Sequence, residues 1–249
     1  MALTSPDGTP ITVRPIEPGE LDRIPLRCWP DRKILDHLFL EQGTIGIAAW
    51  EGEQCVGQLH CYRAILPDAM SEHWPERSRW LPESSWWRQA ARAANLELSG
   101  PGWCHACCHV GRTLETHRQE SEPSERAKGI RKGIDTRYLG RGIGTALCKE
   151  SVRWARQHDY AAVAALGAPE GLPEYAVWAG QLPCTTYAKL GFAVIGLDTE
   201  SKLLPGWADG NSPPEVMAEV RAAMAKGRPE SDFCSRVMAL DLRRVTATE

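Results

Sequence analysis

Three glycines at alternate positions, directly before an amphipathic run, constrain this chain more than any other feature. They lie in residues 137–147, whose sequence is RYLGRGIGTAL. Glycine lacks the Cβ atom that would keep a ligand away from the main chain, so a ligand can approach this backbone closely. The helix that we predict next adds unpaired N–H groups and the positive end of its dipole. The pattern therefore predicts a turn that binds a diphosphate.

The helix predicted after this turn is amphipathic. At 100° per residue, one side is formed by Ile143, Leu147, Cys148, Ser151, Val152, Trp154 and Ala155. The charged and amide residues from Lys149 to Gln157 fall on the other side. We expect the first side to pack on a sheet.

A second segment, residues 186–192 with the sequence TYAKLGF, narrows the interpretation. Together the two segments resemble the GNAT acetyltransferase superfamily, which binds acetyl-coenzyme A. In that family a Gln/Arg-x-x-Gly-x-Gly/Ala loop wraps the pyrophosphate, and a Tyr-x-x-x-Gly-Phe segment later closes a helix and opens a strand. The matching residues are Gly142 and Gly144 in the loop, and Tyr187, Gly191 and Phe192 in the later segment.

Two further residues, both N-terminal to the glycines, can also be compared with the family pattern. Ile134 stands where the family has the last apolar residue of a strand, and Leu139 stands where it usually has Gln or Arg. Leu139 removes one side-chain interaction at most, because the loop works mainly through backbone N–H groups. The resemblance is specific over residues 134–192. It implies acetyl-CoA as cosubstrate and a binding site formed by Ile134, Leu139, Gly140, Arg141, Gly142, Ile143, Gly144 and Thr145.

The resemblance further implies an α+β fold of three layers, with a mixed, mostly antiparallel central sheet flanked by helices. A chain of 249 residues suits a single domain, 1–249, with embellishments. We interpret two stretches as insertions: residues 66–100, with four tryptophans and three prolines, and the strongly polar residues 113–132. The first insertion is either an ordered lid over the acceptor site or a small satellite core.

Sequence patterns also predict the individual elements. Alternating or continuous apolar residues predict strands at 11–15, 45–50, 54–62, 103–112, 160–166, 194–197 and 235–242. Helices are expected to begin near Glu17 and to cover 31–39 and 213–226, with a hairpin turn at 51–53.

Composition limits the classes of partner. A net charge of −3 without any block of like charge disfavours nucleic-acid and membrane surfaces. No apolar run approaches the ~18 residues of a membrane span, and the N-terminus lacks the pattern of a secretory signal. We therefore expect a cytoplasmic protein, and the sequence leaves open whether it is a monomer or a dimer. Nine cysteines, an odd number in a long chain, are expected to be reduced thiols.

Acetyl transfer requires that the acceptor amine lose a proton and that the leaving thiolate be protonated or stabilised. Tyr187 matches the family's usual general-acid tyrosine by its position before LGF, and a phenol can donate a hydrogen bond to sulfur as negative charge develops there. The alternative is a tyrosine that packs on a helix with its hydroxyl in solvent.

The general base has several candidates. His105 and His109 are four residues apart on a predicted strand, and alternation would place both on one face with Cys107 between them. A neutral imidazole, with an unperturbed pKa of ~6.5, can accept a proton from an ammonium group, and this strand often carries the base in the family. The alternatives are hydrogen-bonded core histidines, a base at Glu174 or Tyr175, or a chain of water molecules.

Residues 104–109, with the sequence CHACCH, also contain zinc-like ligand types. The sequence lacks a matched second half, and alternation would point Cys104 and Cys107 to opposite faces, so we expect small buried thiols and no metal. Two functions remain. The first is an N-acetyltransferase that transfers an acetyl group directly from acetyl-CoA to a primary amine of a small molecule or protein. The second is a non-catalytic sensor that binds acyl-CoA or a metal on the same fold.

Overall fold

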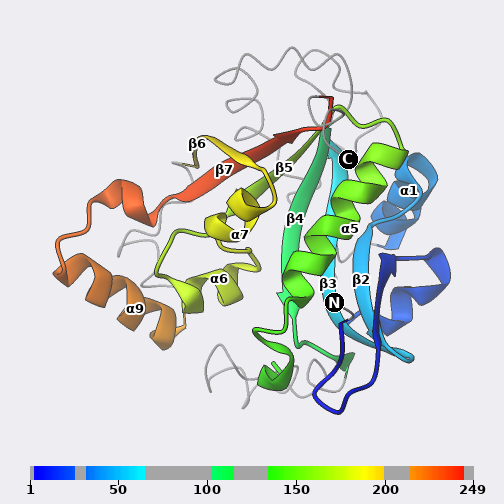
Figure 1. The fold of residues 1–249 in the computed structure, drawn as a ribbon, viewed down its shortest axis with the longest axis horizontal. Helices are drawn as coiled ribbons and strands as arrows, with labels where there is room; N and C mark the ends of the chain where they lie inside the picture. Colours follow the sequence, from blue (N-terminus) through cyan, green and yellow to red (C-terminus); the bar gives the residue numbers. More distant parts are fainter. Residues whose placement is uncertain (1–2, 26–31, 65–101, 115–133, 199–212, 244–249) are drawn as a thin grey trace.

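The computed structural model describes residues 3–25, 32–64, 102–114, 134–198 and 213–243. These residues form a seven-stranded sheet in the order β1-β2-β3-β4-β5-β7-β6, with helices on both faces (Figure 1). Strands β4 and β5 are parallel, and all other neighbours are antiparallel. This confirms the predicted α+β fold with a mostly antiparallel sheet. Apart from Thr113 and Leu114, the two expected insertions lie outside the described residues.

The N-terminal part of the sheet is built from strands that are consecutive in the chain. The strands are β1 (Ile11–Pro15), β2 (Gly46–Glu51), β3 (Gln54–Ala64) and β4 (Gly102–Val110), and the first connection contains η1 (Pro18–Arg23) and α1 (Arg32–Gln42). Each strand pairs antiparallel with the next, and a turn at Gly52 closes the predicted hairpin. The predicted strands are therefore confirmed here, while the first predicted helix is a 3-10 helix.

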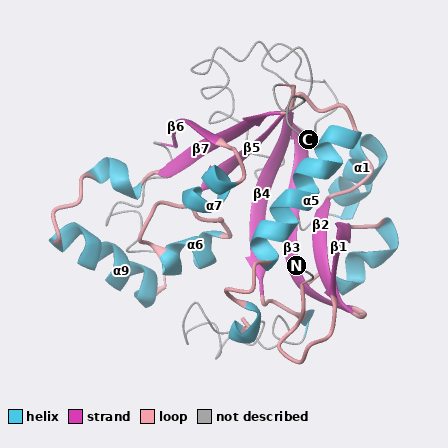
Figure 2. Ribbon diagram, in the orientation of Figure 1, coloured by secondary structure: helices cyan, strands magenta, loops and turns pink. Residues whose placement is uncertain are grey.

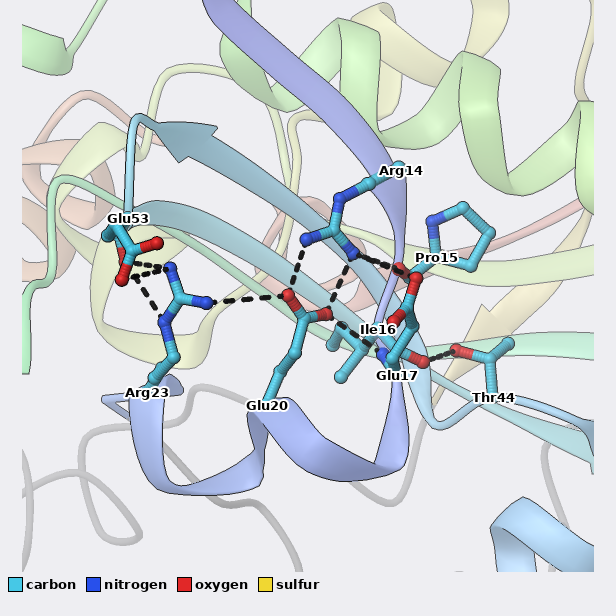
Figure 3. Close-up of polar contacts among 8 residues, drawn as sticks. All are labelled: Arg14, Pro15, Ile16, Glu17, Glu20, Arg23, Thr44 and Glu53. Atoms are coloured by element: carbon cyan, nitrogen blue, oxygen red, sulfur yellow. Dashed lines mark hydrogen bonds and ion pairs between the residues drawn. The ribbon is translucent and has the colours of Figure 1, made fainter.

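A buried acidic residue fastens η1 to the edge of the sheet. The carboxylate of Glu20 accepts hydrogen bonds from Arg14 at 2.8 Å and from the N–H of Glu17 at 3.0 Å (Figure 3). Arg23 lies 3.9 Å from the same carboxylate and 4.7 Å from the ring of Trp50. Burial raises the pKa of Glu20, but the hydrogen bonds and charges of these neighbours outweigh it and hold that pKa below its ordinary value. The cluster therefore stays charged and fixes the connection between β1 and α1.

Helix α5 (Ile143–Gln157) lies diagonally across one face of the sheet in Figure 1. Its buried residues are Ile143, Leu147, Cys148, Ser151, Val152 and Ala155, as predicted. Trp154 is only partly buried and stacks on His158 with the ring centroids 3.6 Å apart. On the opposite face, Leu35 and Leu38 of α1 pack against the sheet. No helix within the described ranges combines the length and the apolar character that a membrane crossing needs.

The C-terminal part alternates strands with helices. Its elements are β5 (Ala162–Gly167), α6 (Pro173–Ala179), α7 (Cys184–Lys189), β6 (Ala193–Asp198), α9 (Pro214–Ala225), η3 (Glu230–Phe233) and β7 (Ser235–Asp241). The sequence patterns predicted every one of these strands but not α6, a helix of seven residues that follows β5. Figure 2 shows α6 and α9 side by side below the β5-β7-β6 edge, and they share an apolar cluster around Val216 and Phe233.

Strands β4 and β5 pair over only three residue positions and then separate. The connection between α6 and α7, residues 180–183, bonds in this opening to β4 and to the residue directly after β5. The carbonyl of Gly180 accepts from the N–H of Cys108 at 2.6 Å, and the carbonyl of Leu182 accepts from the N–H of Ala168 at 2.9 Å. Backbone groups that the diverging strands would leave unpaired are thereby satisfied.

Candidate active site

Contacts with the ends of two strands position the turn that precedes α5. The N–H of Asp135 donates to the carbonyl of Gly111 at 2.7 Å, directly after β4. Gly111 has a φ of 80°, and a Cβ atom there would lie 2.5 Å from the carbonyl oxygen of Asp135, so only glycine fits. Three residues after Asp135, the buried Tyr138 donates its hydroxyl hydrogen to the carboxylate of Glu51. The turn is thus held from β4 on one side and from β2 on the other.

The turn itself presents its backbone to solvent. Gly140 and Gly142 adopt φ values of 72° and 81°, in the left-handed region that favours glycine. Gly142 is the N-cap of α5, and its carbonyl accepts from the N–H of Ala146 at 2.9 Å. Across the described part of the chain, no acceptor pairs with the backbone N–H groups of residues 140–145. This row of free donors at the positive end of a helix is suited to an anion.

Not every residue predicted for this site contributes a free donor. The N–H of Leu139 donates to the carbonyl of Thr136 at 3.1 Å, so it is already used. The missing Cβ of Gly144 makes room for Leu182, whose Cδ2 would lie 2.7 Å from that Cβ. Gly144 therefore serves close packing, while Gly140 and Gly142 serve the open turn.

The two remaining predicted positions lie beside the turn. The guanidinium of Arg141 donates to the carbonyl of Arg137 at 2.7 Å and to that of Ser5 at 3.3 Å, which directs it toward the N-terminal loop. Ile134 is buried but belongs to no strand, because β4 ends at Val110. The predicted place of Ile134 as the last apolar residue of a strand is therefore wrong. Ile143 and Thr145 lie in the first turn of α5, as expected.

Two of the three residues predicted for the chemistry, His105 and Tyr187, meet beneath the middle of α5. His105 Nδ1 lies 3.3 Å from Tyr187 Oη. His105 is 4% exposed and Tyr187 is 2% exposed, so the alternative of a tyrosine with its hydroxyl in solvent is excluded. Phe192 packs against both rings, with centroid distances of 6.3 Å and 5.1 Å. All three residues come from the strand and segment that sequence analysis singled out.

Two residues that sequence analysis left without a role complete this cluster. Ser151 Oγ lies 3.0 Å from His105 Nε2, and Trp103 Nε1 donates to the same Oγ at 2.8 Å. Cys61 Sγ lies 3.5 Å from it. Ser151 stood out in the sequence only as a hydroxyl on the apolar side of a helix, which is a signal for a buried hydrogen bond.

Burial decides the protonation states in this cluster. It lowers the pKa of His105 to about 3, so the imidazole is neutral near pH 7. It raises the pKa of Tyr187 well above its ordinary value, with a further contribution from Cys148, so the phenol keeps its proton. The pair is therefore suited to donating a hydrogen bond and poorly suited to accepting a proton from an ammonium group.

The prediction that His105, Cys107 and His109 share one face is wrong. Ala106 has no partner on β3, which makes it the extra residue of a β-bulge. The bulge shifts the alternation by one residue, so Cys108 packs in the core beneath α5 and its neighbours Cys107 and His109 face the opposite side. His105 and His109 therefore cannot act together on one group. Burial lowers the pKa of His109 as well.

The bulge also corrects the expectation for the cysteines. It brings Cys104 and Cys107 onto the same face of the sheet, contrary to simple alternation. The described residues contain no group of three or more histidine, cysteine or acidic side chains that could hold a metal ion. Cys107 is disulfide-bonded, so the expectation of reduced thiols is wrong at this position, whereas seven other described cysteines are free.

The two outlying candidates for the base, Glu174 and Tyr175, lie at the start of α6. Their backbone N–H groups donate to the carboxylate of Glu219 at 3.1 Å and 3.0 Å. The hydroxyl of Tyr175 is buried and lies 3.2 Å from Ser235 Oγ. Both residues thus hold α6 against α9 and β7.

No family model and no curated protein sequence matches this chain. Solved structures, however, resemble it across most of its length. A putative arylalkylamine N-acetyltransferase 7 from the yellow fever mosquito has a TM-score of 0.53 at 10% identity, and the match covers 97% of this chain and 92% of that chain. The fold is that of the GNAT acetyltransferases. At this identity the likeness is one of fold.

Two other solved structures have slightly lower TM-scores. A mosquito arylalkylamine N-acetyltransferase-like protein 5b has a TM-score of 0.49 at 14% identity, with 93% of this chain and 100% of that chain covered. A Drosophila melanogaster polyamine N-acetyltransferase has a TM-score of 0.46 at 16% identity, with 93% and 100% covered. In the GNAT fold of the present chain, the connection 180–183 joins the open turn to the buried cluster, because Leu182 contacts Gly144 and α7 carries Tyr187.

Proposed function

We propose that this protein is an acetyl-CoA-dependent N-acetyltransferase that transfers the acetyl group directly to a primary amine of a small molecule or a protein. The observation that carries the proposal is the row of free backbone N–H groups in residues 140–145, at the positive end of α5. A pyrophosphate suits this row, because hydrogen bonds to a charged acceptor are stronger than those to a neutral one. Acetyl-CoA would supply the acetyl thioester.

Tyr187 is our proposed general acid. Its phenol remains protonated over the whole physiological pH range, and it belongs to the helix that follows the connection packed on Gly144. A neutral phenol can donate a hydrogen bond to sulfur as negative charge develops there. Because Tyr187 is closed to solvent, this role requires that the ligand displace part of the packing between β4 and α7.

The proton on the acceptor amine needs a different route. His105 is enclosed beneath α5 and has a low pKa, so we assign it no role as a base. His109 is partly exposed on the other side of the sheet, so of these two histidines it is the more accessible to an amine. Its pKa lies below the ordinary value, which weakens it as a base. We propose that water molecules carry this proton away from the amine. If a side chain accepts it, His109 is the candidate.

The binding site can be tested by calorimetry with a pair of matched variants. Gly142→Val puts a branched side chain over the free N–H groups, in a space where Leu3 is the only described residue within 4 Å of a new Cβ. Gly227→Val is the control, because Gly227, which follows α9, has a similar φ of 75° and no described atom within 4 Å of a new Cβ. It therefore carries comparable backbone strain outside the turn.

We expect Gly142→Val to weaken acetyl-CoA binding by roughly 10- to 100-fold, the equivalent of one or two hydrogen bonds to a charged group, and Gly227→Val to bind like the wild type. S-acetylpantetheine, which lacks the pyrophosphate, should not distinguish the two variants. Equal acetyl-CoA affinity in both variants would show that the turn is not the site.

A thiol-release assay then separates the enzyme from the non-catalytic sensor. The wild type is incubated with acetyl-CoA and a panel of primary amines, including arylalkylamines, polyamines and a peptide with a free N-terminus. An enzyme releases free coenzyme A in proportion to the acetylated amine. A sensor binds acetyl-CoA but gives no amine-dependent thiol, and that outcome would exclude the proposed transfer reaction for these acceptors.

A further inference from the structure

Four polar side chains form a continuous chain through the apolar core beneath α5. Trp103 Nε1 lies 2.8 Å from Ser151 Oγ, Ser151 Oγ lies 3.0 Å from His105 Nε2, and His105 Nδ1 lies 3.3 Å from Tyr187 Oη. The exposure of these residues ranges from 0% to 4%. Inside such a core each polar group must be paired, so the direction of every hydrogen bond matters.

The direction of the chain is set at its tryptophan end. An indole N–H can only donate, so Ser151 Oγ accepts from Trp103. The hydroxyl hydrogen of Ser151 then has two neighbours, His105 Nε2 at 3.0 Å and Cys61 Sγ at 3.5 Å. The imidazole nitrogen is both the closer and the stronger acceptor. The thiol of Cys61 already has a hydrogen-bond partner, because it donates to the carbonyl of Leu59 at 3.6 Å.

This direction fixes the tautomer of the histidine. A neutral imidazole that accepts at Nε2 carries its hydrogen on Nδ1, and Nδ1 faces Tyr187. The phenol oxygen therefore accepts from His105, and its own hydrogen remains available for another acceptor. In the opposite tautomer Tyr187 would donate to His105, and its hydrogen would be used inside the core.

We propose that Trp103 and Ser151 hold His105 in the Nδ1–H tautomer, so that His105 orients the phenol of Tyr187 and leaves its hydrogen free for the sulfur of the thioester. Ser151 and His105 are then positioning residues, and neither removes a proton from the amine. The benefit for catalysis rests on the proposed function, whereas the tautomer itself is a property of the protein without ligand. The two parts can therefore be tested separately.

The tautomer is tested by NMR on the 15N-histidine-labelled wild type near pH 7.5. Long-range 1H–15N correlations distinguish a protonated ring nitrogen from an unprotonated one, and the His105→Gln spectrum identifies the His105 signals among those of the seven histidines. We expect a protonated Nδ1 and an unprotonated Nε2. A protonated Nε2 in the wild type would overturn the proposal without bearing on the acetyltransferase activity.

The positioning role is tested with variants around the serine hydroxyl. Ser151→Ala removes the hydroxyl, Ser151→Thr keeps it, and Cys61→Ala removes the other neighbour of that hydroxyl. We expect Ser151→Ala to lower kcat by about 10-fold with little change in the KM for acetyl-CoA, the value of one hydrogen bond. The His105 signals of Ser151→Ala should move toward a mixture of tautomers. Ser151→Thr should restore the Nδ1–H tautomer and most of kcat, and Cys61→Ala should resemble the wild type.

Two results would contradict the positioning role. The first is a wild-type kcat and an unchanged tautomer in Ser151→Ala. The second is an equal loss of kcat in Ser151→Thr and Ser151→Ala while the Nδ1–H tautomer persists in both, because the loss would then come from packing. If the wild type transfers no acetyl group, the proposed function fails, and the NMR experiment still decides whether the chain has the stated direction.

Discussion

The two parts of the candidate site use the same helix in opposite ways. The turn before α5 offers backbone N–H groups to solvent, and Gly140 and Gly142 keep it open. The cluster beneath the middle of α5 offers side chains that are closed to solvent, and these come from β4, α5 and α7. The turn is suited to an anion by local geometry alone. The cluster obtains its properties from burial, which keeps both His105 and Tyr187 neutral.

This contrast separates binding from chemistry. Changes in the turn should alter affinity for the ligand and leave protonation states alone, because backbone amides do not titrate. Changes in the cluster should alter the reaction rate and the pH dependence of stability. The reason is that the surrounding core shifts the pKa values of its titratable groups and hydrogen bonds link these groups to one another. Three experiments test that separation, beginning with the largest expected effect.

The largest effect is expected for Tyr187→Phe. Removing the hydroxyl keeps the ring packed against Phe192 and deletes the proposed hydrogen-bond donor, together with the oxygen that faces His105 Nδ1. We expect kcat and kcat/KM to fall together by roughly 10²–10⁴-fold, because the interaction is made in the transition state, while the Kd for acetyl-CoA changes little. Steady-state kinetics and calorimetry measure the two quantities. An unchanged kcat with acetyl transfer as the slow step would remove Tyr187 from the chemistry.

A smaller effect concerns stability at low pH. Burial lowers the pKa of His105 to about 3 and that of His60 to about 4, whereas unfolded histidine titrates near ~6.5. Below pH ~6.5 the unfolded chain therefore binds protons that the native state excludes, and stability falls as the pH drops toward these values. One such histidine lowers the unfolding free energy by about 2 kcal/mol at pH 5 relative to pH 7.5.

Urea denaturation of wild type and His105→Gln at pH 7.5 and pH 5 measures this difference. We expect the variant to lose about 2 kcal/mol less between the two pH values than the wild type does. Gly142→Val is the comparison from the turn, and it should show the full wild-type loss. The same pH dependence in His105→Gln and wild type would mean that His105 is not held neutral by the core.

The smallest effect is expected at Gly144, and it tests whether this glycine serves packing against Leu182 or binding of the ligand. A Cβ at this position would lie 2.7 Å from Leu182 Cδ2, so Gly144→Ala should be better tolerated by about 1 kcal/mol in a Leu182→Ala background than in the wild type. Unfolding free energies of the two single variants and the double variant give this coupling. If Gly144 instead serves the ligand, the stability coupling is absent and Gly144→Ala weakens acetyl-CoA binding in both backgrounds.

The sequence predicted much of the architecture, because most of it depends on short-range patterns. Alternation or continuous apolar runs located the strands, and the 3.6-residue period located α5 and its buried side. The helix α6 was missed because seven residues give too short a periodic pattern, and so short a helix forms only through its packing on α9. The expected lid at 66–100 lies outside the described residues and stays a prediction.

Within the site, the sequence alone determined the open turn, because left-handed glycines and the N-terminus of a helix are local properties of consecutive residues. It also placed Tyr187 at the end of a helix. Only the tertiary structure decided which histidine meets that tyrosine. A single unpaired residue, Ala106, reverses the alternation of β4, and a bulge depends on pairing with β3 that no local pattern in β4 contains. The pairing of Ser151 with His105 likewise required a helix and a strand 46 residues apart to pack face to face.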